Sequence, residues 1–373
     1  MLNIHLYRSN FLNESRINRE VKVIEQMKIF NQIDLIGINQ IGLLPKEKVS
    51  DVVCIYRFIG RNKKRNLFYT IFNIFLWHIL VFNKYLFKDI KCINCHSINV
   101  FPLAVILKLI KGSKLIYDAH ELETETAALS GFSKMIAKIT ERLLIRFSDH
   151  SIFVSESIEN WYRRNYAIKN TTCIYNCPAF VKLKKSNYLN EKFNIDLESK
   201  IFIYQGAFVE DRGLEILLEV FKNGKSENNI VFLGFGKLEK KIKEFSKKKK
   251  NIFFHEKVKP DQVLKITKSA NFGISLVDGK YLNHQFCLPN KLFEYIMAGL
   301  PVLVSDTIEL KNFVSTNSVG IACKFEKKSL SQSIDEIILK ENSFKKSLGK
   351  VSSYYDFNSQ KYKYKKIYNK FFI

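Results

Sequence analysis

In the N-terminal half of the chain, short apolar runs alternate with longer segments in which apolar residues recur every three or four positions. The first pattern is typical of buried parallel strands, and the second of helices that pack on a sheet. The predicted strands are 2–6, 34–38, 51–56, 90–95, 114–117 and 151–154, and the predicted helices are 15–30, 67–82 and 101–110. Strands that alternate with helices predict an α/β fold with a doubly wound parallel sheet.

The same alternation resumes in the C-terminal half, with predicted strands at 201–204, 230–233, 252–255, 272–276 and 302–304. The segment between the halves is polar, rich in lysine and interrupted by Pro178. At 373 residues the chain is long enough for two domains, each with its own core. We therefore predict a first domain at 1–176, a linker at 177–199, a second domain at 200–353 and a terminal helix at 354–373.

The segment 288–306, LPNKLFEYIMAGLPVLVSD, predicts a short helix that leads into a buried strand. Asn290 is a favourable residue for the N-cap of this helix. Gly299 can adopt the left-handed conformation after the last turn, and Pro301 prevents the helix from continuing. The apolar stripe of the helix consists of Leu292, Phe293, Ile296 and Met297.

Asn290, Lys291 and Glu294 fall together on the first turn of this helix, beside the positive end of its dipole. A diphosphate can use that dipole together with a lysine, and a carboxylate can accept hydrogen bonds from a ribose or sugar hydroxyl. The alternative is an ordinary capped helix before a strand, which any α/β domain contains.

Two further positions follow predicted strands and are candidates for chemistry. His120 comes after the strand that ends at Tyr117, and ligands of open parallel sheets bind beyond the carboxyl ends of the strands. It can equally cap the following helix or be satisfied within a loop. Arg212 lies at the entrance of a helix shortly after Gly206, where an arginine can pair with phosphate. In isolation Arg212 is also consistent with a surface residue.

The composition indicates a folded, strongly basic protein. Hydrophobic residues make up 46% of the chain, and 60 Lys and Arg against 36 Asp and Glu give a formal net charge of +24. Such a charge favours polyanions, namely nucleic acid, nucleotide phosphates or an anionic membrane surface. The aromatic residues lie at core-like spacing and not on an exposed basic strand, so we expect no nucleic-acid partner.

Seven cysteines, an odd number, and an N-terminus too short and polar for a secretory signal predict a reducing, cytoplasmic location. Cys92, Cys95 and His96 resemble a metal-binding spacing. They fall in a predicted strand, where alternate residues diverge across the sheet, so buried free thiols are the preferred interpretation. We expect no metal.

The segment 67–82 is almost wholly apolar but covers only about 16 residues, whereas a bilayer span needs about 20. We therefore expect either a core helix of the first domain or a helix at a membrane surface. The second alternative predicts a protein that is peripheral on the inner face of the membrane.

The wording LPNKLFEY resembles the donor-site motif of family-four glycosyltransferases, which are retaining enzymes with the GT-B fold. The segments YDAHE at 117–121 and FVSESI at 153–158 are also similar to that family. The resemblance implies two Rossmann-like doubly wound domains that face a cleft. It also implies site residues. Glu294 would bind the donor ribose, with Asn290 beside it. Arg212 and Lys291 would bind the diphosphate, and the backbone at Val258 would contact the base. His120 would face the transferred sugar.

Two positions depart from the family pattern. Phe286 stands where the fuller motif has a glutamate near the transferred sugar, and Ala207 stands where an arginine is usual. The first departure bears on the contacts to the sugar, and the second leaves Arg212 and Lys291 to share the phosphates.

The resemblance implies transfer of a sugar from a nucleotide-sugar donor to a saccharide or lipid-linked acceptor with retention, in cell-surface polysaccharide or glycolipid assembly. No cofactor is expected, because no DxD cluster occurs and cationic side chains with a helix terminus can hold the leaving diphosphate. The alternatives are a nucleotide-sugar epimerase with the GT-B fold and a non-catalytic basic protein that binds membrane or nucleic acid.

Overall fold

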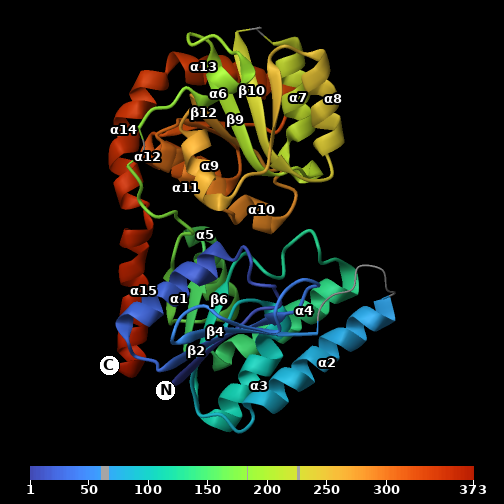
Figure 1. Cartoon of the computed structure of the whole chain (residues 1–373), viewed down its shortest axis with the longest axis vertical. Coiled ribbons are helices and arrows are strands. Elements are labelled where there is room, and N and C mark those ends of the chain that lie inside the picture. Colours follow the sequence, from blue (N-terminus) through green and yellow to red (C-terminus); the bar gives the residue numbers. More distant parts are fainter. Residues whose placement is uncertain (60–66, 183, 225–226) are drawn as a thin grey trace. The chain divides into compact units, whose positions relative to one another are not determined.

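The computed structural model describes residues 1–59, 67–182, 184–224 and 227–373. The chain divides into two compact units (Figure 1). The first consists of Met1–Ile174 together with Lys361–Ile373, and the second of Tyr175–Gln360. The C-terminal residues therefore return to the unit in which the chain begins.

An eight-stranded sheet forms the centre of the first unit, in the order β3-β4-β2-β1-β5-β6-β7-β8. All neighbours are parallel except β3, which is antiparallel to β4. The strands are β1 Leu2–Leu6, β2 Gln32–Ile38, β3 Lys46–Lys48, β4 Val53–Phe58, β5 Ile90–Cys95, β6 Lys114–Ala119, β7 His150–Phe153 and β8 Thr171–Cys173. The six strands predicted for this half are confirmed. The two that were missed, β3 and β8, have three residues each, too few to show a periodicity.

The helices of the first unit are α1 Ser15–Met27, α2 Leu67–Tyr85, α3 Phe101–Lys111, α4 Gly131–Leu144, α5 Glu156–Tyr166 and the later turns of α15 Phe357–Phe372. The buried Tyr364 and Tyr368 of α15 contribute to this unit. The hydroxyl of Tyr368 lies 2.9 Å from Glu20 Oε1 and 3.0 Å from Asn94 Oδ1, within hydrogen-bond distance of both. The C-terminal helix is thereby tied to α1 and β5.

The helix α2 contains the apolar segment expected either in the core or at a membrane, and one side of it is buried while another is exposed. Trp77 and Val81 are fully buried, whereas the exposed fractions of Phe72 and Phe75 are 50% and 63%. The indole of Trp77 donates to the carbonyl of Gly37 at 2.8 Å, which fixes the inward face on β2. No helix within the described residues is both long enough and apolar enough to cross a bilayer.

The second unit is built on a six-stranded, all-parallel sheet in the order β11-β10-β9-β12-β13-β14. Its strands are β9 Lys200–Ala207, β10 Asn228–Phe235, β11 Ile252–Glu256, β12 Phe272–Ser275, β13 Val302–Ser305 and β14 Gly320–Cys323. Its helices are α6 Tyr188–Phe193, α7 Leu214–Asn223, α8 Glu239–Lys248, α9 Pro260–Thr267, α10 Leu282–Phe286, α11 Asn290–Ala298, α12 Ile308–Asn317, α13 Lys327–Leu339 and α14 Glu341–Tyr354. The stretch expected as a linker contains α6, whose Leu189 is buried.

Each sheet has a point at which the order of the strands reverses. In the second unit, the chain runs from β9 outward to β11 and then returns to β12 on the other side of β9. In the first unit, the corresponding neighbours are β1 and β5. Open parallel sheets bind ligands in the crevice beyond the carboxyl ends of such strands. The residues that follow β9, β12, β1 and β5 are therefore the places to search for sites.

Candidate functional site

The helix α11 begins at the carboxyl end of the second unit's sheet and carries the predicted donor residues. Pro289 occupies the N-cap position, with φ −64° and ψ 143°, and Asn290 is already helical. The prediction that Asn290 is the N-cap is therefore wrong by one residue, because Pro289 already supplies the extended cap conformation. Asn290 Oδ1 instead accepts a hydrogen bond from Asn176 Nδ2 at 2.7 Å. The predicted end of the helix is confirmed, since Gly299 is left-handed with φ 73°.

Lys291 projects from the first turn of α11 toward the end of β9. Its Nζ lies 3.8 Å from the ring centroid of Tyr204, and a Cβ added to Gly206 would lie 3.7 Å from the same atom. Burial, and next the neighbouring charge of Arg212, lower the pKa of Lys291 to about 7, while Glu294 opposes the shift. An anion placed between the two cations would favour the charged lysine.

Arg212 closes a 3-10 turn, Glu210–Arg212, in the loop after β9, and its side chain is 30% exposed. The adjacent Asp211 Oδ2 lies 3.3 Å from His284 Nε2, and His284 Nδ1 lies 2.6 Å from Asp278 Oδ1. His284 thus connects the loops that follow β9 and β12. Sequence reasoning missed this connection, because His284 and Asp278 belong to no apolar periodicity or motif.

Glu294 lies one turn into α11 and accepts a hydrogen bond from the amide of Gln205 at the end of β9. The Gln205 Oε1 atom accepts from Thr267 Oγ1 at 2.6 Å, and the Gln205 backbone N–H donates to the Tyr295 hydroxyl at 3.0 Å. Gln205 therefore joins β9 to α9 and α11 and orients the carboxylate. It was not among the predicted site residues, although a buried polar residue that ends an apolar strand is a usable signal.

The other predicted positions are more scattered. Val258 lies in the loop between β11 and α9, and β11 is two strands away from β9 in the sheet. Phe286 ends α10, on the same helix as His284, at the position where the family motif has its first glutamate. The structure thus brings Arg212, Lys291 and Glu294 together and leaves Val258 at the edge of this group.

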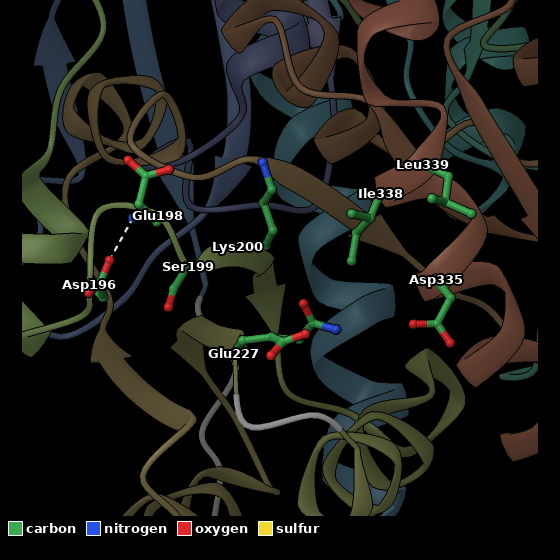
Figure 2. A pocket seen from close by; sticks show the side chains of 9 residues that line it. Asp196, Glu198, Ser199, Lys200, Glu227, Asp335, Ile338 and Leu339 are labelled. Atoms are coloured by element: carbon green, nitrogen blue, oxygen red, sulfur yellow. Dashed lines mark hydrogen bonds between the residues drawn. The ribbon is translucent and has the colours of Figure 1, made fainter.

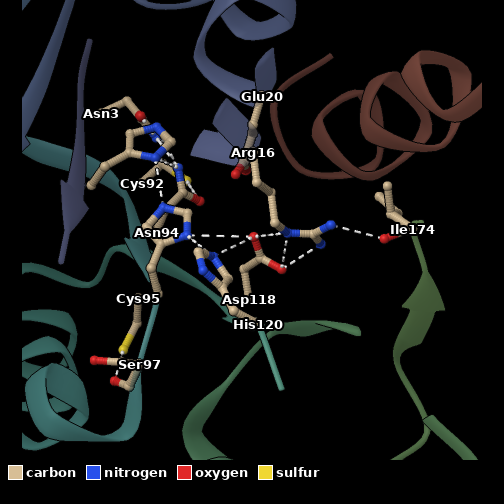
Figure 3. Close-up of polar contacts among 12 residues, drawn as sticks. Asn3, Arg16, Glu20, Cys92, Asn94, Cys95, Ser97, Asp118, His120 and Ile174 are labelled. Atoms are coloured by element: carbon tan, nitrogen blue, oxygen red, sulfur yellow. Dashed lines mark hydrogen bonds and ion pairs between the residues drawn. The ribbon is translucent and has the colours of Figure 1, made fainter. Parts of the chain in front are cut away.

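In the first unit, His120 belongs to a cluster of polar residues at the ends of β1, β5 and β6 (Figure 3). Its Nε2 atom lies 3.4 Å from Asp118 Oδ2 and 3.3 Å from His96 Nδ1. The ring of Tyr7 packs against it at a centroid distance of 5.3 Å. The side chain of His120 is 19% exposed, whereas that of His96 is fully buried. His120 is therefore the histidine of this cluster that can meet a ligand.

Hydrogen bonds determine the tautomers of the buried histidines in this cluster. The amide of Asn94 donates to His5 Nε2 at 2.8 Å, so His5 Nδ1 carries the proton and donates to His96 Nε2 at 2.9 Å. The remaining nitrogen of His96, Nδ1, then carries a proton and faces Asp118 Oδ2 at 3.4 Å. Burial lowers the pKa of His96 to about 4 and that of His5 well below its usual value, so both are neutral at pH 7.

Asp118 is the anionic centre of the cluster. Burial alone would raise the pKa of its carboxyl, but the charge of Arg16 and the two neighbouring histidines bring that pKa well below its usual range. An ionised Asp118 accepts the proton of His120 Nε2. His120 Nδ1 is then the ring nitrogen that neither Asp118 nor His96 engages, and it is the one that can interact with a substrate hydroxyl.

Two sets of ligand-type atoms occur here, one from His5, Glu20 and His96 and the other from His96, Asp118 and His120. Within the second set, His96 and His120 both face Asp118, which also pairs with the guanidinium of Arg16, so these atoms form a hydrogen-bond network among themselves. Cys92 and Cys95 of β5 are buried free thiols, as predicted. The expectation that no metal is bound stays a prediction.

A separate pocket lies at the opposite end of the second unit's sheet (Figure 2). It is lined by residues that precede or begin β9 and β10, among them Ser199, Lys200 and Glu227. Asp196 accepts from the backbone N–H of Glu198 at 2.7 Å, and Lys200 pairs with Glu341 at 2.9 Å. Because ligands of open parallel sheets bind at carboxyl ends, this amino-end pocket carries no functional assignment.

Comparisons with known proteins agree with the motif. The family described as "Glycosyl transferases group 1" matches residues 186–352. Over 265 residues the chain is 22% identical to the chitobiosyldiphosphodolichol beta-mannosyltransferase of Kluyveromyces lactis. The aligned segment covers 61% of this chain and 58% of that protein. The chain therefore spans little more than half the length of this relative.

The similar solved structures extend over nearly the whole chain. Sucrose-phosphate synthase from Thermosynechococcus elongatus has a TM-score of 0.79 at 13% identity, covering 99% of this chain and 98% of that one. Anabaena HepE in complex with UDP-glucose has a TM-score of 0.75 at 12% identity, and the match covers 99% of this chain and 100% of that one. At such identities the likeness shows the fold, and the predicted GT-B architecture is confirmed. Residues 186–352 of the chain thus match the glycosyl transferases group 1 family, and the chain has the GT-B fold.

Proposed function

We propose that this protein transfers a sugar from a nucleotide-sugar donor to an acceptor, with retention of the anomeric configuration. The observation that carries the proposal is the grouping of two cations and an oriented carboxylate, Arg212, Lys291 and Glu294, at the carboxyl end of β9 and the start of α11. The grouping lies within the segment that matches the family. Its residue types suit a diphosphate next to a ribose.

In the proposed donor complex, Lys291 and Arg212 bind the diphosphate at the N-terminus of α11. Glu294 accepts hydrogen bonds from the ribose hydroxyls, held in place by Gln205. Asn290 lies beside them, and the backbone near Val258 contacts the base. Anabaena HepE, solved with UDP and with UDP-glucose, supports a uridine nucleotide as the first donor to test.

Departure of the nucleoside diphosphate places negative charge on the leaving oxygen. The two cations and the helix dipole would stabilise this charge as it develops, which accelerates the step because the interaction is stronger in the transition state. We assign His120 to the acceptor or to the transferred sugar. The orientation of His120 by Asp118 favours a role in positioning. We expect neither a metal nor another cofactor to take part.

We further propose a lipid-linked acceptor in glycolipid or cell-surface polysaccharide assembly, at the cytoplasmic face of a membrane. The similar protein from Kluyveromyces lactis is a chitobiosyldiphosphodolichol beta-mannosyltransferase, whose name describes an acceptor linked to diphosphodolichol. WaaG, a glycosyltransferase involved in lipopolysaccharide biosynthesis, has a TM-score of 0.61 at 12% identity and covers 95% of each chain. Both support an acceptor of this class.

Calorimetric titration with UDP, GDP and ADP, followed by incubation with the corresponding nucleotide sugars, tests the proposal. We expect one nucleoside diphosphate to bind and its sugar to be transferred, with NMR of the product reporting the anomeric configuration. A protein that binds none of these nucleotides would contradict the proposal. Release of an altered nucleotide sugar without any acceptor would show an epimerase instead.

A further inference from the structure

The helix α4 has its apolar side turned outward. Phe132, Met135, Ile136, Ile139 and Leu143 recur at helical spacing and form one stripe, and their exposed fractions are 72%, 50%, 47%, 51% and 50%. An amphipathic helix of a globular protein normally turns such a stripe toward the core. Here the stripe faces solvent.

Polar contacts on the inner side hold α4 in this orientation. Its one fully buried residue is Glu141, which accepts from the hydroxyls of Tyr117 at 2.7 Å, Tyr162 at 2.6 Å and Tyr166 at 3.1 Å. Lys134 and Lys138 both pair with Glu125, from the loop that precedes the helix. These contacts require the polar side to face the protein, so the outward position of the apolar stripe is determined by the structure.

The neighbouring helices α3 and α2 extend the same layer. The connections β4-α2-β5, β5-α3-β6 and β6-α4-β7 all step across the sheet in the same direction, so right-handed crossovers place the three helices on one face (Figure 1). Further exposed apolar residues on this layer are Ile71, Phe72, Phe75 and Ile79 of α2 and Ile106, Leu109 and Ile110 of α3. Single exposed apolar residues are ordinary, but three adjacent helices that each present several of them indicate a binding surface.

The charge of this layer selects the partner. Within their bounds, the three helices contain one acidic residue, the buried Glu141, against six basic residues. The basic residues are Lys84, Lys108, Lys111, Lys134, Lys138 and Arg142. Lys108 is paired with Asp149, and Lys134 and Lys138 are paired with Glu125, so the cations of these helices that can meet an anionic lipid surface are Lys84, Lys111 and Arg142. A second copy of the same surface would bring like charges together, which disfavours self-association.

We propose that the outward face of α4, extended by α3 and α2, docks on an anionic lipid bilayer. This inference rests on the proposed function and deepens it. The loop that leads from His120 to α4 carries Glu125, and its ion pairs with Lys134 and Lys138 hold α4 to the segment that follows His120. A helix that rests on the membrane would then adjoin the part of the chain assigned to the acceptor. The exposed part of α2, considered from sequence as the membrane helix, becomes one component of a larger surface.

Sedimentation with phosphatidylcholine vesicles, with and without phosphatidylglycerol and without any glycosyl acceptor, tests this docking. We expect the full chain to sediment with the anionic vesicles and to do so less at high salt, because screening weakens the electrostatic part. The combined variant Phe132→Ser, Ile136→Ser, Ile139→Ser should lower the partition coefficient more than about tenfold, since each side chain loses its burial in the bilayer.

A matched variant of the second unit, Leu197→Ser, Ile308→Ser, Leu339→Ser, replaces three residues that are 66%, 49% and 86% exposed and should bind vesicles like the unchanged protein. UDP titration of each variant shows that its fold and donor site are intact. It also separates failure of docking from failure of the proposed function. Docking would be refuted if the unchanged protein remained in the supernatant at low salt, or if the α4 variant sedimented equally. A dimer that the α4 variant dissociates would identify a second copy as the partner instead.

Discussion

Arg16 and Asp118 form a buried, two-point ion pair in the first unit. The guanidinium Nη2 lies 2.6 Å from Oδ1 and Nε lies 3.0 Å from Oδ2, with side-chain exposures of 6% and 0%. The third nitrogen, Nη1, donates to the carbonyl of Ile174 at 2.8 Å. Because Asp118 lies near the end of β6, two residues before His120, the pair ties α1 to the segment that carries this histidine.

Asp118→Asn should destabilise the protein by about 3–5 kcal/mol, because it leaves the Arg16 charge buried without its partner. Urea unfolding monitored by circular dichroism measures the change. The matched variant Asp51→Asn replaces a carboxylate that is 98% exposed, and its unfolding midpoint should not move. Equal midpoints for the two variants would contradict a structural role of the pair.

The same carboxylate predicts a dependence of stability on pH. Its pKa in the folded protein is well below the usual value, so its contribution is fully present above the pKa of the unfolded chain, about 4. The contribution declines as the pH falls below that value. The slope of unfolding free energy against pH below this point should therefore be smaller for Asp118→Asn than for the unchanged protein.

UDP binding should be coupled to uptake of a proton by Lys291. The pKa of this lysine in the free protein is about 7, owing to burial and to Arg212, and a bound diphosphate would raise it. Between the free and bound pKa values, affinity for UDP should therefore decrease as the pH rises. Titration calorimetry in buffers of different ionisation enthalpy measures the uptake, which Lys291→Met should abolish. Uptake that persists in Lys291→Met would assign the proton to another group.

Arg212 and Lys291 should act on one anion and so give non-additive losses. Arg212→Met and Lys291→Met should each weaken UDP binding, and the double variant should lose clearly less than the sum, with a coupling of about 0.5–3 kcal/mol. Lys240→Met on α8 serves as the charge-matched control. Strictly additive losses would place the two residues on different parts of the ligand.

Glu294→Ala should cost about 2–3 kcal/mol of donor or transition-state binding, because a charge-assisted hydrogen bond is lost and its partner is left unpaired. Gln205→Ala should cost less, since this residue positions the carboxylate and does not touch the ribose itself. Glu244→Ala, on the exposed side of α8, controls for the change in net charge. Transfer kinetics that are unchanged in folded Glu294→Ala would remove this residue from the donor site.

His120→Ala should lower the transfer rate by about 100-fold, the lower end of what a positioned proton-transfer or hydrogen-bonding group contributes. UDP affinity should remain close to that of the unchanged protein. A large loss of UDP binding would move His120 into the donor site, and full activity would leave it with a structural role only.

Local pattern was sufficient for most of the strands and for the unit α11–β13, but β3, β8 and β14 were not predicted. Buried parallel strands show as apolar runs, and the helix 290–298 is followed by a left-handed glycine and a proline, so these elements could be predicted from neighbouring residues alone. The motif residues Lys291 and Glu294 could be assigned to one turn for the same reason. Helical spacing requires no knowledge of the rest of the chain.

The partners of those residues depend on the tertiary structure. Gln205 reaches Glu294 across 89 positions, and Arg16 reaches Asp118 across 102. The buried chain of Asn94, His5 and His96 forms because β1 and β5 are neighbours in the sheet. No local periodicity specifies which strands become adjacent, so the histidine tautomers and the orientation of His120 could not be predicted.

The helix α4 shows most clearly what the local sequence determines and what the tertiary structure decides. Its apolar residues recur at helical spacing, and from sequence alone such a stripe indicates a face toward the core. The tertiary structure decides otherwise, because Tyr117, Tyr162 and Tyr166 surround Glu141 on the inner side and Glu125 holds two lysines there. The sequence determined that this helix would have two faces. Contacts with distant residues decided which face meets the solvent, because Glu141, buried on the inner side, needs its hydrogen-bond partners there.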